Sequence, residues 1–437
     1  MVFDLLFGKG RKKTPDPDIN FGRYSDNNKS VAKVNRWAEA ESLFKQNDHL
    51  ASLDAFFDYL RDDAVDNVVF DRDGQGGSFQ LYQGSKVVRG KFDSEKMEAE
   101  ITLARMPQPS VPVMRRLLDM NFNLYYCRYA LDNDRLCMRF DSSIKTANPN
   151  KLYYALRELA TKADKMDDLL VQEFASLQTI DTDHIIEIPQ AEKEVKYHFM
   201  QQQISDTLHY VASLDEEKFA AGIAYLLLTL AFRIDYLVCP EGKLLNELEK
   251  IVEIYYKRDE KLITEKNKLM IDAFTRLMQR TKDEVFPYLF RSKYTFAVAA
   301  PHHHKAVADS IANSHANLPT YRENNYLLIA NSVVEYGFSF CQYSYSLPKP
   351  LRDLFKLYMQ VNYGSYFKAL GFGSTLYDPT NNRFAADEIK ESVADIIAAW
   401  KDKYPKMEFR TNTLRFDDLL QFNVSFTTEI SQMNFDA

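Results

Sequence analysis

The chain has 437 residues, of which 46% are hydrophobic and 27% are charged. This balance is typical of a globular protein with a large core, and it disfavours long disordered stretches. The net charge of -7 gives no overall positive field, so we expect no nucleic-acid partner. At about 150 residues per domain, the length predicts three domains, or two of which one is large.

The cysteines indicate a reducing compartment. They are scattered, without a CxxC pair: Cys127, Cys137, Cys239 and Cys341. This pattern disfavours a disulfide framework and a structural zinc site, and we expect a cytoplasmic protein with no metal and no cofactor. Asp4 interrupts the opening apolar run, which disfavours a signal peptide. The longest apolar stretch, 219–232, is shorter than the ~20 residues of a membrane span, so no transmembrane segment is expected.

Residues 1–31 are predicted to be a flexible tail. Apolar side chains come first, and basic residues follow between positions 9 and 13. Such a segment could dock on an anionic membrane or in a partner's groove. One helical turn buries little area, so an unstructured terminus is the simpler interpretation.

Residues 32–175 are predicted to form a domain of helices and an antiparallel sheet. Helical spacing begins near Val34, and Asp48 can cap a second helix. From Asn67 the pattern changes to about four alternating, strand-like segments separated by turns. Ser110 can cap a short helix with four residues expected to face inward: Val113, Met114, Leu117 and Leu118.

The clearest local pattern is a β-hairpin formed by strands at 121–131 and 135–140. With Asn133-Asp134 as its loop, three opposed pairs on one face are apolar: Leu131 with Leu136, Tyr129 with Met138, and Cys127 with Phe140. A shift of register by one residue destroys this match, and the register places Cys127 and Cys137 on opposite faces.

The other face of this hairpin is the candidate partner-binding site. It gathers residues of types that are enriched in interfaces: Tyr126, Arg128, Arg135 and Arg139. Arg128 and Arg139 are directly opposed, and like charges in that position are mildly destabilising. Either a partner neutralises them, or nearby carboxylates and the following helix do so.

A long helix is predicted to begin at Asn148 and Pro149, which are favoured at the N-cap and the first helical position. Its apolar residues form one stripe: Leu152, Leu156, Leu159, Ala163, Met166 and Leu170.

The rest of the chain is predicted to comprise a helical region, 190–290, and a mixed but mostly helical C-terminal region, 291–437. Helices are expected at 191–213, 216–238, 243–287, 351–370 and 385–400, and strands at 184–189 and 422–426. The fold class is therefore α+β.

The order of elements over residues 33–172, with the passage from Met120 to Asp141, resembles the YbjN and type III secretion chaperone-like superfamily. The resemblance covers about a third of the chain. It departs from the family in having about four strands before Ser110 where the family has three. It implies a binding fold, often dimeric, that holds partner polypeptides and has no catalytic apparatus.

Motifs for catalysis or metal binding all have simpler explanations. Consecutive histidines at 302–304 would fan around a helix, whereas zinc ligands converge from one face. Gly371-Phe372-Gly373-Ser374 follows a helix, which predicts a helix cap and not a phosphate loop. The charged run at 257–261 is typical of a solvated helix face. No catalytic or metal-binding residue is predicted.

The leading hypothesis is a non-enzymatic protein-binding or scaffold protein with a chaperone-like N-terminal domain. We expect a protein partner, and the resemblance allows a homodimer. The alternative is an enzyme of unknown class whose site is assembled non-locally in the C-terminal region. A third hypothesis is a component of a membrane-associated assembly that docks through residues 1–13.

Overall fold

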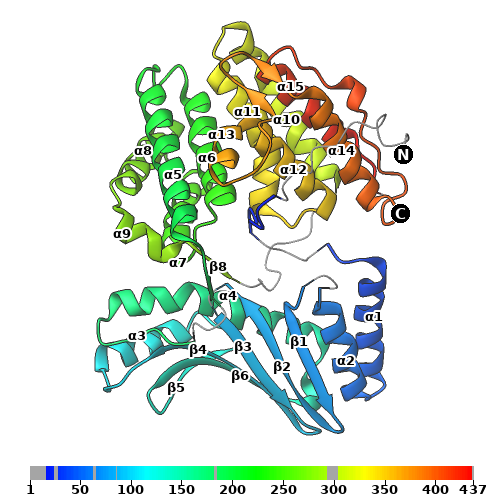
Figure 1. Ribbon diagram of the computed structural model, residues 1–437. Coiled ribbons are helices and arrows are strands. Elements are labelled where there is room, and N and C mark those ends of the chain that lie inside the picture. Colours follow the sequence, from blue (N-terminus) through cyan, green and yellow to red (C-terminus); the bar gives the residue numbers. More distant parts are fainter. Residues whose placement is uncertain are drawn as a thin grey trace, which may run out of the picture.

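The computed structural model has two hydrophobic cores (Figure 1). The structure describes residues 16–23, 28–62, 65–84, 86–181, 185–292 and 304–435. One core is formed by residues between 40 and 177, and we call residues 28–181 the sheet domain. The other core is formed by residues between 188 and 433 together with Ile19 and Phe21, and we call 16–23 and 185–435 the helical domain.

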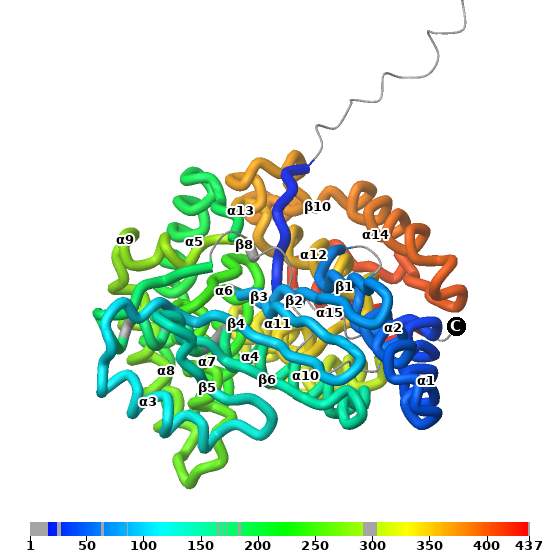
Figure 2. The backbone as a smooth tube through the Cα atoms, turned by 90° about the horizontal axis from the view of Figure 1, so that it is seen from below, coloured from blue at the N-terminus to red at the C-terminus, as the bar shows by residue number. Residues whose placement is uncertain are grey.

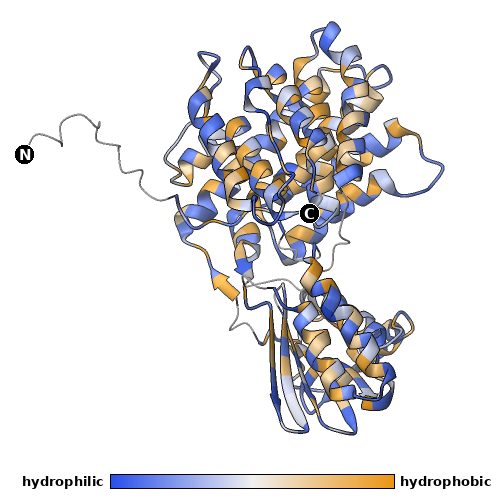
Figure 3. Cartoon of the chain, turned by 90° about the vertical axis from the view of Figure 1, so that its right-hand side faces the viewer, coloured by the Kyte–Doolittle hydropathy of each residue, from blue (hydrophilic) through white to orange (hydrophobic). Residues whose placement is uncertain are grey.

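The sheet domain is an antiparallel six-stranded sheet with flanking helices, as the α+β prediction requires. Its elements are α1 (Val31–Lys45), α2 (His49–Leu60), β1 (Val68–Asp73), β2 (Gly76–Gln83), β3 (Lys86–Phe92), β4 (Lys96–Arg105), α3 (Val111–Asn121), β5 (Arg128–Asp132), β6 (Arg135–Ser143) and α4 (Pro149–Glu173). The strand order is β1-β2-β3-β4-β6-β5, so β1 and β5 are the edges. The described helices of this domain lie to one side of the sheet (Figure 3).

Helix α4 forms the predicted stripe and packs on β2, β3, β4 and β6. The Asn148 carboxamide oxygen accepts the N–H of Lys151 at 2.9 Å, which confirms the N-cap. Four members of the stripe are completely buried: Leu152, Leu156, Leu159 and Ala163. A regular apolar stripe facing a sheet explains why this helix could be predicted.

A glycine in β3 lets an aromatic ring of β2 lie over the neighbouring strand. Gly90 lies opposite Phe79 of β2, and a Cβ atom at position 90 would lie 1.9 Å from the Phe79 ring. The space left by the missing side chain lets Phe79 pack against Phe57 of α2, with 4.7 Å between ring centroids. We infer that Gly90 is required for close packing between α2 and the sheet.

The helical domain combines the predicted 190–290 and 291–437 regions around one core. Its elements are β7 (Ile185–Glu187), α5 (Gln190–Ala212), α6 (Ala220–Val238), α7 (Gly242–Tyr256), α8 (Ile263–Met278), α9 (Lys282–Val285), β8 (Phe290–Ser292), α10 (His304–Glu323), α11 (Leu327–Ser344), α12 (Lys349–Asn362), α13 (Gly364–Ala369), β9 (Tyr377–Asp378), β10 (Arg383–Phe384), α14 (Ala386–Trp400) and α15 (Leu419–Gln432).

Three elements predicted in the helical domain differ from the structure. The expected helix at 243–287 is broken between α7 and α8, where the Lys266 ammonium caps the carbonyl of Tyr255 at 3.0 Å. The expected helix at 351–370 is two helices, α12 and α13, which meet at Tyr363. The expected strand at 422–426 is part of helix α15.

Helix α6 is the central helix of this core. It is long and apolar enough to cross a membrane by length and composition, but 89% of that stretch is buried inside the protein. Its Arg233 donates two hydrogen bonds of 3.1 Å to Glu335 of α11, and the Tyr363 hydroxyl donates to the same carboxylate at 2.6 Å. A buried helix with its charge paired is the arrangement of a core helix in a soluble globular protein.

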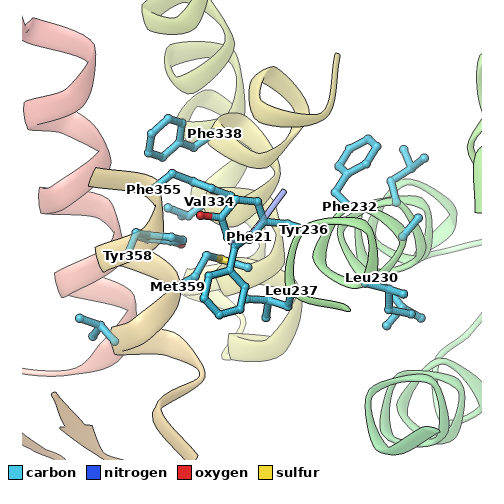
Figure 4. Close-up of a cluster of buried hydrophobic side chains, with 14 of the residues drawn as sticks. Phe21, Leu230, Phe232, Tyr236, Leu237, Val334, Phe338, Phe355, Tyr358 and Met359 are labelled. Atoms are coloured by element: carbon cyan, nitrogen blue, oxygen red, sulfur yellow. The ribbon is translucent and has the colours of Figure 1, made fainter. Parts of the chain in front are cut away.

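The segment at residues 16–23 packs into the helical domain, although it falls within the expected tail. Phe21 is 7% exposed and lies beside Tyr236 (Figure 4), with 6.1 Å between the ring centroids. The N–H of Gly22 donates to the Tyr236 carbonyl at 2.8 Å, and Arg23 binds Asp235 at 2.7 Å. Residues 1–15, including the apolar and basic cluster, lie outside the described residues.

The sheet domain is therefore an insertion between two parts of the helical domain (Figure 2). The chain leaves the helical core after residue 23, forms the sheet domain, and returns through β7. The domains touch where α4 packs on α7, and Lys349 of α12 lies 3.4 Å from Asp62.

Candidate functional site

The β5–β6 hairpin has the predicted register. Asn133 has a φ of 55°, the left-handed conformation that two-residue hairpin loops require. The opposed pairs are Asp132–Arg135, Leu131–Leu136, Tyr129–Met138 and Arg128–Arg139. The predicted first strand is too long, because α3 continues to Asn121 and β5 begins only at Arg128. Cys127 consequently lies outside the strand.

The three arginines of the candidate site share one face and contact carboxylates. Arg128 contacts Asp141, Arg135 contacts Asp132 at 2.6 Å, and Arg139 contacts Glu100 and, at 3.1 Å, Asp132. These contacts correspond to the alternative in which neighbouring carboxylates neutralise the arginines. Exposed pairs of this kind are each worth about 0–1 kcal/mol. Tyr126 lies in the preceding turn and is 42% exposed.

A polar row crosses the outer face of the sheet at the level of these arginines. The strand registers align one residue from each of five strands: Gln80, Arg89, Glu100, Arg139 and Arg128. The side chain of Arg89 is about half exposed and pairs with Asp181 at 2.7 Å. The outer face is therefore a solvated, charged surface, and apolar contact area must come from elsewhere.

Glu158 of α4 fixes the turn between α3 and β5. Its carboxylate accepts three backbone N–H groups, from Tyr125 and Tyr126 at 2.8 Å and from Cys127 at 3.0 Å. The Asn121 side chain accepts the N–H of Tyr129 at 2.7 Å. Hydrogen bonds to a carboxylate are stronger than neutral ones, so the turn is rigid. The same bonds occupy N–H groups that an edge strand would otherwise offer to an added strand.

An exposed apolar surface lies next to this turn. On α3 and the residue that follows it, positions spaced by four, three and four share the outward face: Val111, Arg115, Leu118 and Phe122. Phe122 is 90% exposed, and Tyr125 in the turn is 92% exposed. We call these five residues the α3 surface. Large apolar side chains gathered in this way indicate an interaction site.

The prediction that Leu118 faces inward is wrong. It is 62% exposed, whereas Val113 and Leu117 are buried. Positions four apart lie on one helix face, and the next position is rotated by about 100° out of it. The helical spacing of the residues in the α3 surface is present in the sequence. It could not be recognised as an outward face, because the sequence alone does not say which face of this helix packs on the sheet.

A cleft of about 720 Å³ in the helical domain is a second candidate. It lies between α15, the α10–α11 connection and the β9–β10 hairpin. Arg322 and Arg415 line it, as do the carboxylates of Asp418 and Glu429. Pockets of this size are typical of small-molecule sites.

Both carboxylates of the cleft serve the local structure. Asp418 caps α15 by accepting the N–H of Gln421 at 2.8 Å. Glu429 accepts the Arg410 guanidinium at 2.9 and 3.0 Å and the Thr413 hydroxyl at 2.9 Å. Burial alone would raise the pKa of Glu429, but the hydrogen bonds from Arg410 and Thr413 lower it below its usual value. A carboxylate held as an anion is unsuited to general-acid catalysis.

In comparisons with known proteins, no family model and no curated protein matches the chain. Within the described residues, no cluster of three or more His, Cys, Asp or Glu could hold a metal ion. Of the three consecutive histidines, only His304 is described. It starts α10 and its Nε2 lies 2.7 Å from the Ile430 carbonyl, so it packs against α15 and is not a purely solvated helix start.

Proposed function

We propose that the protein is a non-enzymatic binding or scaffold protein whose sheet domain holds a partner polypeptide on the α3 surface. The observation that carries this proposal is the pair of aromatic side chains, Phe122 and Tyr125, which are about nine-tenths exposed. They flank a turn whose backbone is held by Glu158, so little of the backbone there must be ordered on binding. Aromatic residues and arginine concentrate binding energy in interfaces.

The chemistry of the α3 surface specifies the kind of partner. Arg115 lies within the apolar stripe, and in the described part of the chain it has no ion-pair partner. A helix with an apolar face and one carboxylate would cover the stripe and pair with Arg115. Strand addition to β5 is disfavoured, because Asn121 occupies its N–H group at Tyr129 and Glu158 occupies the N–H of Cys127, just before the strand.

The predicted site residues Tyr126, Arg128, Arg135 and Arg139 would form the rim of this interface. The charges of the three arginines are balanced by neighbouring carboxylates, so we expect these residues to influence association rate and selectivity more than affinity. The resemblance to the YbjN and type III secretion chaperone-like superfamily supports a polypeptide-binding role, and a reducing cytoplasmic location agrees with four free cysteines.

The test compares variants of the full-length chain. A partner is captured from native lysate by the wild type, and its affinity for each purified variant is then measured. Phe122→Ser with Tyr125→Ser should weaken binding by at least about a hundredfold, the effect of one or two lost hot spots, without lowering the melting temperature. Leu269→Ser, which removes a 41% exposed leucine from α8, is the matched control and should bind normally.

Two results would reject the proposal. One is a partner that binds the double serine variant as tightly as the wild type. The other is a wild-type dimer that the same two substitutions convert to monomer, because a second copy of the chain would then occupy the surface. Arg128→Glu with Arg139→Glu should change the association rate severalfold if these residues form the rim, and should leave it unchanged if their role is only structural.

The alternative hypothesis, an enzyme with a site in the C-terminal region, would place that site in the cleft beside α15. The carboxylates in that cleft are its candidates for acid–base catalysis, and both are committed to hydrogen bonds within the fold. The cleft is better suited to binding than to proton transfer.

A further inference from the structure

We infer that the cleft beside α15 binds a small organic anion with an apolar body. This site is separate from the α3 surface, because it is built entirely by the helical domain. Its volume of about 720 Å³ lies within the range of small-molecule pockets.

The apolar part of the cleft comes from two helices and a hairpin. Leu420 and Val424, four residues apart on α15, contribute one wall, and Tyr377 of β9 also lines the space. Leu327, the first residue of α11, lines it too and is 48% exposed. A leucine exposed at the mouth of a cleft is covered when an apolar ligand enters.

Most polar side chains that line the cleft already have partners. The Asn331 amide donates to the Leu327 carbonyl at 3.0 Å, and its oxygen accepts from Asn423 at 3.0 Å. The Thr428 hydroxyl donates to the Val424 carbonyl at 2.7 Å. Glu429, Asp418, Ser425, Thr413, Gln421 and Asn382 are likewise hydrogen-bonded within the fold.

The two arginines are the exceptions. Arg322 has no ion-pair partner within the described ranges, and Arg415 contacts only the exposed Asp417, at 3.2 Å. A guanidinium has five N–H donors and no acceptor. The hydrogen-bond donors that remain without a partner in the cleft therefore belong to cationic groups, whereas its carboxylates already accept hydrogen bonds. We therefore expect the polar head of the ligand to be an anion such as a carboxylate or a phosphate.

The experiment uses three small-molecule probes that each contain an eight-carbon alkyl group or acyl group: octanoate, octyl phosphate and octanamide. They are titrated into the full-length protein and followed by calorimetry and by the shift in melting temperature. We expect both anions to bind saturably and the neutral amide to bind at least tenfold more weakly. The ratio between octanoate and octyl phosphate distinguishes a carboxylate site from a phosphate site.

Variants locate the site. Arg322→Met with Arg415→Met should abolish the preference for anions, and Leu327→Asp should weaken binding of all three probes. Lys305→Met removes a largely exposed cation from α10 outside the cleft and should leave binding unchanged. The double serine variant of the α3 surface should also bind normally, so this inference can fail or succeed independently of the proposed function.

Three outcomes overturn the inference. The first is equal binding of octanamide and octanoate. The second is an unchanged affinity for octanoate in the double methionine variant when its melting temperature equals that of the wild type. The third is the absence of saturable binding of either anion at millimolar concentration.

Discussion

At the scale of single residues, the four cysteine thiols lie where burial disfavours the thiolate. Burial raises the pKa of Cys137, Cys239 and Cys341 to about 11, and that of Cys127 still further. A free thiol with a pKa near 8.5 is about one-quarter ionised at pH 8, whereas a pKa near 11 leaves about one thiol in a thousand as thiolate. Since the thiolate is the nucleophile, the native protein should react slowly.

We therefore predict that a thiol-specific disulfide reagent modifies the native protein slowly at pH 8, and that the rate increases as the pH approaches 11. Four thiols should react at once in denaturant without reductant. Rapid native reaction would contradict the burial of these groups. Fewer than four thiols in denaturant would contradict the assignment of all four as free.

The hairpin shows how far sequence reasoning reaches for individual residues. The local register of Arg128 and Arg139 could be predicted, because a two-residue loop fixes it. The carboxylate that pairs with Arg139 could not, because Glu100 lies on β4 and reaches the arginine only through the register between β4 and β6. The three backbone hydrogen bonds to Glu158 could not be predicted either, because Glu158 lies on α4 and meets the turn before β5 only in the folded domain.

At the scale of elements, helices α4 and α15 differ in how clearly the sequence specifies them. Helix α4 has a capping residue, a proline at its start and a long stripe facing one sheet. In α15, Phe422, Val424 and Phe426 imitate the alternation of a strand, yet Phe422 and Phe426 are also four apart and both are fully buried. A short apolar run fits both periods, and only its tertiary surroundings decide between them.

Two histidines of α10 bind α15 in their neutral form. His315 Nε2 lies 2.9 Å from the Thr427 hydroxyl, and His304 Nε2 lies 2.7 Å from the Ile430 carbonyl. Because the carbonyl only accepts and the hydroxyl donates to Asn423, both Nε2 atoms carry the proton. Burial lowers the pKa of both imidazoles, with the hydrogen bond to Ile430 opposing the shift in His304.

The lowered pKa values predict that stability falls as the pH decreases below about 6.5, the ordinary histidine pKa, because the unfolded chain then binds protons that the folded chain does not. Urea unfolding between pH 8 and 5.5 should show this decrease. His315→Gln should flatten the profile, and His198→Gln, at a site whose side chain is 67% exposed, should not. An identical slope in wild type and His315→Gln would contradict the prediction.

At the scale of the whole molecule, the unforeseen feature is the packed segment at 16–23. A short stretch next to charged residues has no periodicity, so the sequence offered no sign that Phe21 belongs to a core whose other residues begin more than 160 positions later. The α+β class and the sheet domain could be predicted, because local patterns specify them. The insertion of one domain into the other could not, because it depends on contacts between distant segments.

Because the chain has two hydrophobic cores, we predict that the local stability of the sheet domain and that of the helical domain can be changed separately. Phe21→Ala removes a buried ring from the helical domain, and a buried phenylalanine replaced by alanine typically costs about 3–5 kcal/mol. Amide hydrogen exchange should then become faster in α6 and α12 and stay unchanged in β4 and α4. Phe57→Ala is the matched control, because Phe57 is fully buried in the sheet domain and should produce the reverse pattern. If either substitution accelerates exchange equally in both domains, the chain unfolds as one unit, and contacts between the domains, such as that between Lys349 and Asp62, couple the two cores.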